Sequence, residues 1–290
     1  MFNAIDLIRA NPSAKRYEIG ENVFTRFTCP AQEEPFGIWS EHDHFVHVLS
    51  ARSTWITTCG EVAADVGETV FFRKGALVMP PHYEADLCIL IVFLSDSVVR
   101  ETVRELTGQL APLVDQAVPK EPAIRLNRDV TLSAFFASIA AYFAGDVSPP
   151  EALLKIKLKE LLTGILVGRS NPGLSAYLRL SARHHAPSIP MIMEANFRYN
   201  LSLDAFARLC HRSLSTFKRE FQKIYATTPK KWLLERRLDC AARLLHTPEM
   251  NVTEVAFECG FEDASHFCRV FKIKFGHPPS VNRSAVKVLA

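Results

Sequence analysis

The sequence predicts an α+β protein of two domains: an N-terminal domain of short β-strands followed by helices, and an all-helical C-terminal domain. Three observations support this class. The first part of the chain has short segments of β-branched and aromatic residues separated by Gly, Pro and acidic residues. The middle of the chain has apolar residues at helical spacing. Residues 202–280 contain one helical pattern twice, which indicates a duplicated supersecondary unit.

Length, composition and charge agree with this division. The chain has 290 residues, 48% of them hydrophobic, which is enough for two cores of ordinary size. The net charge of +3 is unevenly distributed: residues 169–290 have 19 Lys or Arg and 10 Asp or Glu, whereas residues 1–168 have 15 and 21. Affinity for a polyanion such as nucleic acid is therefore expected of the C-terminal part.

The sequence predicts a cytoplasmic protein without a membrane segment. Its longest apolar run, residues 87–94, is far below the roughly 20 residues that span a bilayer, and the N-terminus lacks the charged-then-apolar order of a signal peptide. Seven cysteines without a CxxC pair are typical of a reducing compartment. Most of them are expected to be buried as small hydrophobic residues, and a zinc site or a redox switch is the alternative.

The N-terminal domain, residues 1–168, is expected to begin with a loose arm. Between about residues 20 and 95 the pattern then predicts a small antiparallel barrel or sandwich. The expected strands are residues 23–27, 37–39, 45–49, 54–58, 69–73, 77–79 and 88–94. Its interior either holds an apolar ligand or is filled by side chains, and in both cases the lining residues would be Phe71, Phe72, Ile91 and Phe93.

Helices are expected to follow at residues 97–106, 130–143 and 151–167, where the last two are separated by Pro149 and Pro150. Their apolar stripes can pack on the strands or contact a second copy of the chain. Gly and Pro recur between residues 169 and 187, which predicts a linker between the two domains.

The C-terminal domain, residues 188–290, contains the repeated pattern. Leu203, Phe206 and Ala207 recur 49 positions later as Val252, Val255 and Ala256, and Phe217, Arg219, Phe221, Tyr225 and Pro229 recur 50 positions later as Phe267, Arg269, Phe271, Phe275 and Pro279. Each copy predicts a helix, a turn and a second helix with two buried aromatic residues at i, i+4. Ser202 and Asn251 are the expected caps of the first helices, and the second helices should begin near Ser213 and Asp263.

Basic residues mark the exposed side of both second helices. Lys218, Arg219 and Arg269 project there, where a helix in the major groove would contact phosphates and base edges. The alternative is two ordinary amphipathic helix pairs with solvated charges. The repetition favours two helix-turn-helix units.

This region resembles the DNA-binding domain of the AraC/XylS family of bacterial transcription regulators. The residues that carry the resemblance are Ala241 to Leu245, Val255, Ala256, Gly260, Phe261, Asp263, Ser265, Phe267, Arg269, Phe271, Lys272, Phe275, Gly276 and Pro279. The family implies that one long helix, here residues 229–245, joins two reading helices that enter successive major grooves about 34 Å apart. Carried over by position, the DNA contacts would be Ser215, Lys218 and Arg219, then Ala264, Ser265, Cys268 and Arg269.

One turn departs from the family. His211 stands where related sequences often have glycine, a change that costs little provided that its φ is negative. Ala264 and Cys268 offer only apolar or weak contacts, so the second reading helix is expected to contribute less to sequence readout than the first.

The resemblance also has implications for the N-terminal domain. It implies a cupin-like barrel, and a dimer contact through the helix at residues 151–167, for which the candidates are Leu154, Leu158, Leu161, Leu162 and Ile165. Segments 71–75, 157–162 and 171–172 are similar to a subset of the family that activates type III secretion genes. In that subset an anti-activator protein, rather than a small molecule, can be the effector of the N-terminal domain.

The predicted function is therefore sequence-specific regulation of transcription, as an activator that binds double-stranded promoter DNA, acts with RNA polymerase and forms a homodimer. A repressor or silencing antagonist with the same fold is the alternative. A metal-dependent cupin enzyme with a DNA-binding tail is a further one, since His42 and His44 would share one face of a strand near His47 and His82. The usual ligand set is incomplete, so no metal, cofactor or catalytic residue is predicted.

Overall fold

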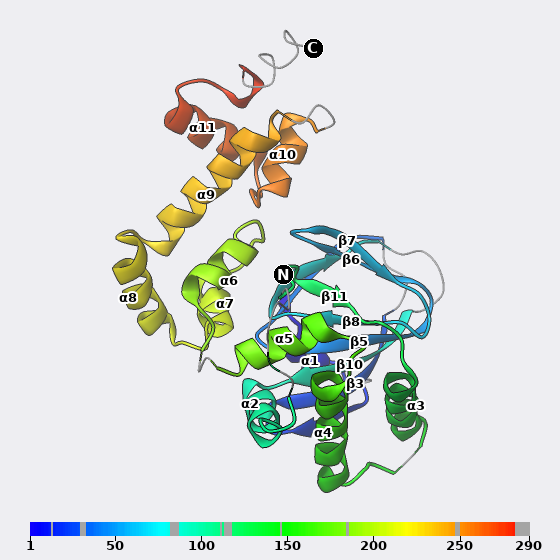
Figure 1. Cartoon of the computed structure of the whole chain (residues 1–290). Coiled ribbons are helices and arrows are strands. Elements are labelled where there is room, and N and C mark those ends of the chain that lie inside the picture. Colours follow the sequence, from blue (N-terminus) through cyan, green and yellow to red (C-terminus); the bar gives the residue numbers. More distant parts are fainter. Residues whose placement is uncertain are drawn as a thin grey trace. The chain divides into compact units, whose positions relative to one another are not determined.

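The computed structural model describes residues 1–12, 14–29, 33–81, 87–110, 112, 118–145, 147–183, 186–246 and 250–281. The chain forms two compact units, Met1–Pro187 and Ser188–Ala290. The first contains the β-sheets and five helices of the described residues, and the second is helical (Figure 1). No helix in the described part of the chain is long and apolar enough to cross a membrane.

The larger sheet of the first unit has the strand order β11-β8-β5-β10-β3-β2. Its strands are β2 (Arg16–Ile19), β3 (Asn22–Cys29), β5 (Asp43–Ser50), β8 (Thr69–Phe72), β10 (Leu87–Leu94) and β11 (Ala123–Arg125). All neighbours in it are antiparallel. All eight residues of β10 are buried, which is why the sequence there is a continuous apolar run rather than an alternating one.

The smaller sheet has the order β1-β4-β9-β6-β7 and lies against one face of the larger sheet. Its strands are β1 (Phe2–Asn3), β4 (Phe36–Ser40), β6 (Ser53–Thr57), β7 (Gly60–Ala64) and β9 (Gly75–Met79). Apolar side chains of both sheets, among them Val46, Trp55 and Phe72, form one core between them. The two sheets are separate ladders in the described residues, so the predicted barrel is an open, cupin-like sandwich rather than a closed one.

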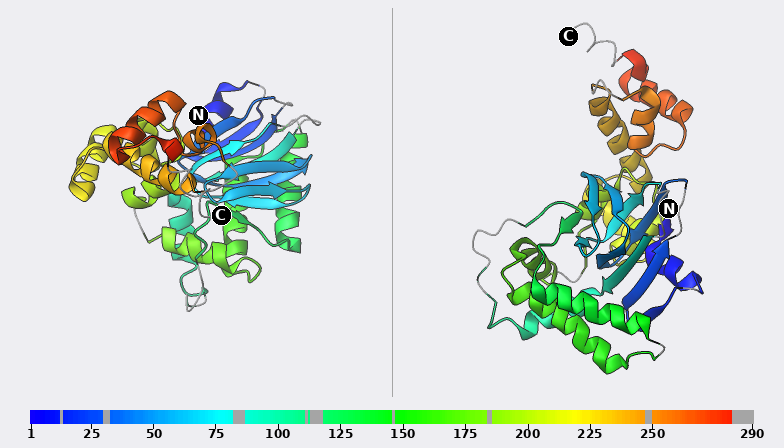
Figure 2. Two further views of the ribbon diagram at one scale, coloured as in Figure 1. Left: turned by 90° about the horizontal axis from the view of Figure 1, so that it is seen from above. Right: turned by 90° about the vertical axis from the view of Figure 1, so that its right-hand side faces the viewer.

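Helices cover the other face of the larger sheet (Figure 2). They are α2 (Asp96–Glu105), α3 (Val130–Ala144), α4 (Glu151–Val167) and α5 (Pro172–Ser181), while the short α1 (Ala4–Ala10) packs at the N-terminus. A second core lies beneath them, in which Phe45, Phe71 and Leu90 of the sheet meet Phe135 and Phe136 of α3. Alternate residues of a strand point to opposite faces, so β5, β8 and β10 contribute to both cores.

The apolar stripe of α4 is buried within the chain. Leu154, Leu158, Leu161, Leu162 and Ile165 are between 0% and 4% exposed and belong to the core beneath the helices. These side chains are not available for contact with a second copy, so their prediction as dimer residues is wrong. The physical reason is that the same stripe is the one surface with which α4 can cover the sheet.

The predicted linker is shorter than its sequence suggests. Asn171 begins α5, whose Leu174, Tyr177 and Leu178 are buried in the same core as the α4 stripe. The helix is therefore part of the first unit, and the second unit starts at Ser188. Pro172 at the first turn of α5 explains the misreading, because proline there starts a helix as readily as it breaks one.

The second unit consists of α6 (Ile189–Asn196), α7 (Leu203–Leu209), α8 (Leu214–Tyr225), α9 (Pro229–Leu244), α10 (Val252–Glu258) and α11 (Ala264–Phe275). The predicted helices are confirmed, including the long one, α9. With 16 residues it spans about 24 Å. The two helix pairs α7–α8 and α10–α11 lie toward its opposite ends (Figure 1).

Candidate nucleic-acid interface

The first helix pair is built as the sequence predicts. The Ser202 hydroxyl accepts a hydrogen bond from the Ala205 amide and starts α7, and the Ser213 hydroxyl accepts one from the Thr216 amide and starts α8. Phe217 and Phe221 are fully buried, with ring centres 5.7 Å apart. These caps and the aromatic pair fix the direction of α8, and its opposite face is left to solvent.

The second pair repeats this construction with other capping residues. Asn251 and Glu254 form a capping box at the start of α10, as their spacing predicts. The Asp263 carboxylate accepts hydrogen bonds from the amides of Ser265 and His266 at 2.8 and 3.1 Å and starts α11. These bonds to the ionised form hold the pKa of Asp263 below its usual value.

The turns of the two pairs differ in residue type but share their backbone shape. His211 has φ 54° and Gly260, at the equivalent position, has φ 84°. The condition under which histidine would cost little, a negative φ, is therefore not met at His211, because the turn requires the left-handed conformation whichever residue occupies it. A Cβ atom at Gly260 would lie 2.3 Å from the carbonyl oxygen of Arg198, so this position requires glycine for space as well.

Arg237 of α9 ties the second turn to the start of the unit. Its guanidinium donates hydrogen bonds to the carbonyl oxygens of Phe197, Tyr199 and Gly260 at 2.8, 2.9 and 2.9 Å. This role was not predictable from the sequence, since Arg237 lies in a helix with several other basic residues. Three fixed carbonyl acceptors around one planar cation make the junction of α6, α9 and the second turn rigid.

The predicted contact residues of α8 face solvent. Ser215, Lys218 and Arg219 are exposed. Neither Lys218 nor Arg219 has a hydrogen bond or ion pair among the described residues. Both charges are thus available to phosphates, in contrast to Arg212 in the turn, whose guanidinium pairs with Glu220 at 2.6 Å.

The predicted contact residues of α11 are less uniform. Ser265 and Arg269 are exposed, whereas Ala264 and Cys268 are half-buried. Lys272, one turn beyond Cys268, is also exposed and without an ion pair in the described residues, although it is not among the predicted contacts. Its signal was available: it lies four residues after Cys268 and therefore on the same helix face.

The sandwich contains an apolar cavity of about 230 Å³. Phe72, Ile91 and Phe93 line it as the sequence predicts, and Trp55 adds to its wall. Phe71 does not, because it precedes Phe72 in β8 and therefore points to the opposite face, where it packs against Tyr177 with ring centres 5.7 Å apart. Two consecutive residues of one strand cannot line the same cavity.

The histidines are separated by the sheet. His44 lines the apolar cavity, stacked on Phe72 and Phe93, and burial lowers its pKa to about 4. His47 lies on the other face, stacked on Phe136, and burial likewise lowers its pKa to about 4. His82 lies outside the described residues. Within them, no group of three or more His, Cys, Asp or Glu side chains is placed to hold a metal.

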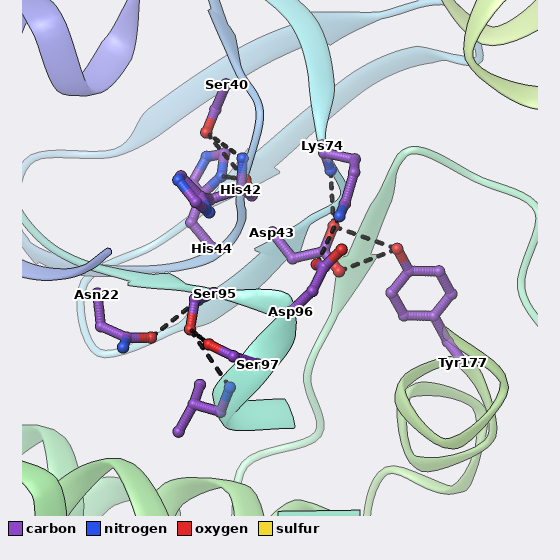
Figure 3. Close-up of polar contacts among 11 residues, drawn as sticks. Asn22, Ser40, His42, Asp43, His44, Lys74, Ser95, Asp96, Ser97 and Tyr177 are labelled. Atoms are coloured by element: carbon purple, nitrogen blue, oxygen red, sulfur yellow. Dashed lines mark hydrogen bonds and ion pairs between the residues drawn. The ribbon is translucent and has the colours of Figure 1, made fainter. Parts of the chain in front are cut away.

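A polar cluster attaches α5 to the strands (Figure 3). The Tyr177 hydroxyl donates to the Asp43 carboxylate at 3.0 to 3.1 Å, and the same carboxylate accepts from the Lys74 amide at 2.8 Å. The Lys74 ammonium pairs with Asp96 at 2.6 Å, and the Arg73 guanidinium lies 4.2 Å from the centre of the Tyr177 ring. Burial, followed by the charge of Asp43, raises the pKa of Tyr177 above its usual value.

Two protein-family models match parts of the two units. Residues 43–177 match the ExsA N-terminal regulatory domain, and residues 206–285 match a helix-turn-helix domain. The virulence regulon transcriptional activator VirF of Yersinia enterocolitica is 28% identical over 242 residues, which are 81% of this chain and 87% of VirF. The HTH-type transcriptional regulator ExsA of Pseudomonas aeruginosa is 28% identical over 217 residues, 75% of this chain and 77% of ExsA.

Solved structures include one similar protein that extends over both units. A crystal structure of ToxT from Vibrio cholerae aligns with 89% of this chain and 96% of its own, at 12% identity and a TM-score of 0.41.

Proposed function

We propose that this chain, a member of the AraC/XylS family of DNA-binding transcriptional regulators, reads promoter DNA with α8 and α11. One observation carries the assignment of these helices. The side chains of Lys218, Arg219 and Arg269 are exposed and make no ion pair in the described residues. Each of the two helices is oriented by its own buried aromatic pair, at equivalent positions of the repeat. Their charges are therefore directed to an external anion.

In the proposed complex, some side chains of α8 and α11 contact phosphates and others contact bases. Lys218 and the capped N-termini contact phosphates and set the register on the duplex. Arg219 and Arg269 are suited to the edge of a guanine, where the planar guanidinium donates two hydrogen bonds. Ser215 and Ser265 add shorter contacts near the start of each helix. Ala264 and Cys268 contribute apolar contacts only, so α8 provides most of the base discrimination.

The test is binding of the full chain to DNA fragments selected from a random pool, followed by fluorescence anisotropy. Arg219→Ala is expected to weaken binding to the selected sequence by about 1–3 kcal/mol and to relax discrimination at one base pair. Arg169→Ala removes the same charge from an exposed site of the first unit and is the control. Equal loss on every sequence would make Arg219 a phosphate contact, and no loss on any would exclude α8 from the interface.

Activation, rather than repression, is the direction we propose, with RNA polymerase as a partner and the cytoplasm as the place of action. The name of VirF as a virulence regulon activator and the match to the ExsA regulatory domain support virulence genes, among them type III secretion genes, as targets. Transcription in vitro from the selected promoter with purified RNA polymerase decides the direction, because a repressor or silencing antagonist would not raise the yield of transcript from naked DNA.

Self-association is proposed for the N-terminal unit, through a surface other than the buried stripe of α4. The outer face of that helix exposes Ile156 (61%) and Val167 (47%). Ile156→Arg is expected to shift the full chain from dimer to monomer in analytical ultracentrifugation. Val130→Arg, at an exposed apolar residue of α3, is the matched control. An unchanged dimer in Ile156→Arg would place the contact elsewhere.

The apolar cavity supports an apolar small molecule as the effector, and an anti-activator protein bound to the same unit is the other candidate. A volume of about 230 Å³ lies below the range of about 300–1,000 Å³ that is usual for ligand sites, so the ligand would be small. His44, Asn11 and Trp55 bring polar groups to an otherwise apolar lining. Native mass spectrometry of the purified chain detects a retained ligand. Metal analysis of the same sample tests the enzyme alternative, which requires an ion at stoichiometric amount.

A further inference from the structure

Four arginines of the first unit converge on one cavity between α2 and α5. Arg100 and Arg104 lie one turn apart on α2, while Arg179 lies in the last turn of α5 and Arg183 just beyond the end of that helix. All four line a cavity of about 310 Å³ between these two helices, which lie side by side in Figure 1. The cavity is separate from the apolar one inside the sandwich and belongs entirely to the first unit.

These arginine side chains are unpaired in the part of the chain that the structure describes. None of the four guanidinium groups makes an ion pair or a hydrogen bond there, whereas those of Arg9 and Arg52 of the same unit pair with Glu18 and Asp65. The Nη1 atom of Arg100 is buried without a hydrogen-bond partner. Like charges one helical turn apart repel each other, and a buried donor without an acceptor is costly. An external anion would remove both penalties at once.

The chemistry of the cavity selects the class of anion. Guanidinium groups bind phosphate oxygens in bidentate geometry, and four of them can neutralise several negative charges. Val103 and Leu110 supply an apolar wall beside them. The volume lies within the range of small-molecule sites. We propose that this cavity binds a multiply phosphorylated small molecule of the nucleotide class.

The helix dipole offers an alternative reason for the positions of two of the four arginines. Arg104 and Arg179 lie in the last turns of α2 and α5, where a positive charge stabilises a helix. Arg100 lies in the middle of α2 and Arg183 beyond the end of α5, so this account does not explain either of them. The two accounts predict opposite effects of removing a charge: the loss of a helix-end cation lowers stability, while the relief of repulsion raises it or leaves it unchanged.

The experiment measures thermal unfolding of the full chain without ligand, with pyrophosphate and with ATP. In the wild type both probes are expected to raise the midpoint by about 3–6 °C at 10 to 100 times their Kd. Arg100→Gln and Arg179→Gln should weaken both probes at least tenfold and should not lower the midpoint without ligand. Arg169→Gln, an exposed arginine outside the cavity, should behave as wild type. Arg219→Ala separates this site from the basic DNA-binding unit, since it should keep the full response.

Tighter binding of ATP than of pyrophosphate supports the nucleotide class, because the apolar wall then contributes. A wild-type chain that responds to neither probe overturns the proposal. So does a response that persists in both Gln variants, or a lower midpoint in both variants without ligand. Binding of a glutamate-rich peptide at the four arginines, without any response to pyrophosphate or ATP, would also overturn it in favour of a protein partner. None of these results depends on DNA binding by α8 and α11.

Discussion

The two helix-turn-helix units reach one geometry with different residues. At the turn the first has His211 where the second has Gly260, and after its second helix, α8 or α11, the first has Ala226 where the second has Gly276. All four residues have a positive φ. Only at Gly260 does a neighbouring backbone, the carbonyl of Arg198, occupy the place of a side chain. Both helix-turn-helix units therefore require the left-handed conformation in the turn, but only position 260 requires glycine for lack of space.

The largest effect is expected for Gly260→Ala. An alanine in the left-handed conformation costs roughly 1–2 kcal/mol, and overpacking adds a similar amount. The pair α10–α11 should therefore lose about 2–4 kcal/mol of unfolding free energy. Arg237 holds the carbonyls on both sides of Arg198, which prevents the backbone from moving away. Hydrogen exchange of α10 and α11 measures the loss. His211→Ala is the matched control, and an equal loss there would mean that the two turns do not differ.

A smaller effect concerns the equivalent positions Lys218 and Cys268. Lys218→Ala should weaken DNA binding by about 1 kcal/mol on all sequences and reduce the slope of log K against log salt by about 1, because one phosphate contact is lost. Cys268→Ala should change neither quantity. The measurement is the salt dependence of the Kd for selected and unrelated DNA. Equal slopes in the two variants would show that α8 and α11 contribute alike to phosphate binding.

A reciprocal pair of substitutions tests the cost of the left-handed conformation at the C-terminal ends of α8 and α11. Ala226→Gly should stabilise the unit, and Gly276→Ala should destabilise it, each by about 0.5–1 kcal/mol. A Cβ at Gly276 has no atom within 4 Å, so only the backbone conformation is changed there. Hydrogen exchange of α8 and α11 reports both variants. A loss at Gly276→Ala much larger than the gain at Ala226→Gly would point to a contact besides φ.

The smallest effect is a pH dependence of stability that is restricted to the second helix pair, α10–α11. Asp263 has a folded pKa below its unfolded value of 3.8, so its stabilising contribution is present above that value and is lost as the pH falls through the folded pKa. Asp263→Ser copies Ser213, the neutral cap of α8 in the first helix pair. The variant should be less stable than the wild type at pH 7 and equally stable near pH 2. A difference in stability that persists at low pH would mean that the advantage of Asp263 over serine comes from its hydrogen-bond geometry and not from its charge.

The helices of the second unit were predictable because their signals are local. Caps such as Ser202 and Asn251, and aromatic pairs such as Phe217 and Phe221, act within one or two helical turns, and the duplication shows each of them twice. The exposed faces of α8 and α11 follow from the same periodicity. Lys272 was missed only because the comparison by position stopped at Arg269.

The errors of prediction concern partners that are distant in the sequence. Periodicity shows that the leucines of α4 are covered, but only the packing decides between the sheet and a second chain as the cover. Phe71 and Phe72 are equally apolar, and the pairing of β8 determines which of them meets the cavity.

The sequence by itself determined the two helix-turn-helix units, the strand-rich first unit and the uneven distribution of charge, since each depends on propensities and spacings within a short segment. The tertiary structure alone decided that Gly260 has no room for a side chain, that Arg237 joins three carbonyls and that four arginines from α2 and α5 surround one cavity. Each of these depends on segments that are far apart in the sequence and close together in space. A single sequence does not reveal which distant segments approach each other.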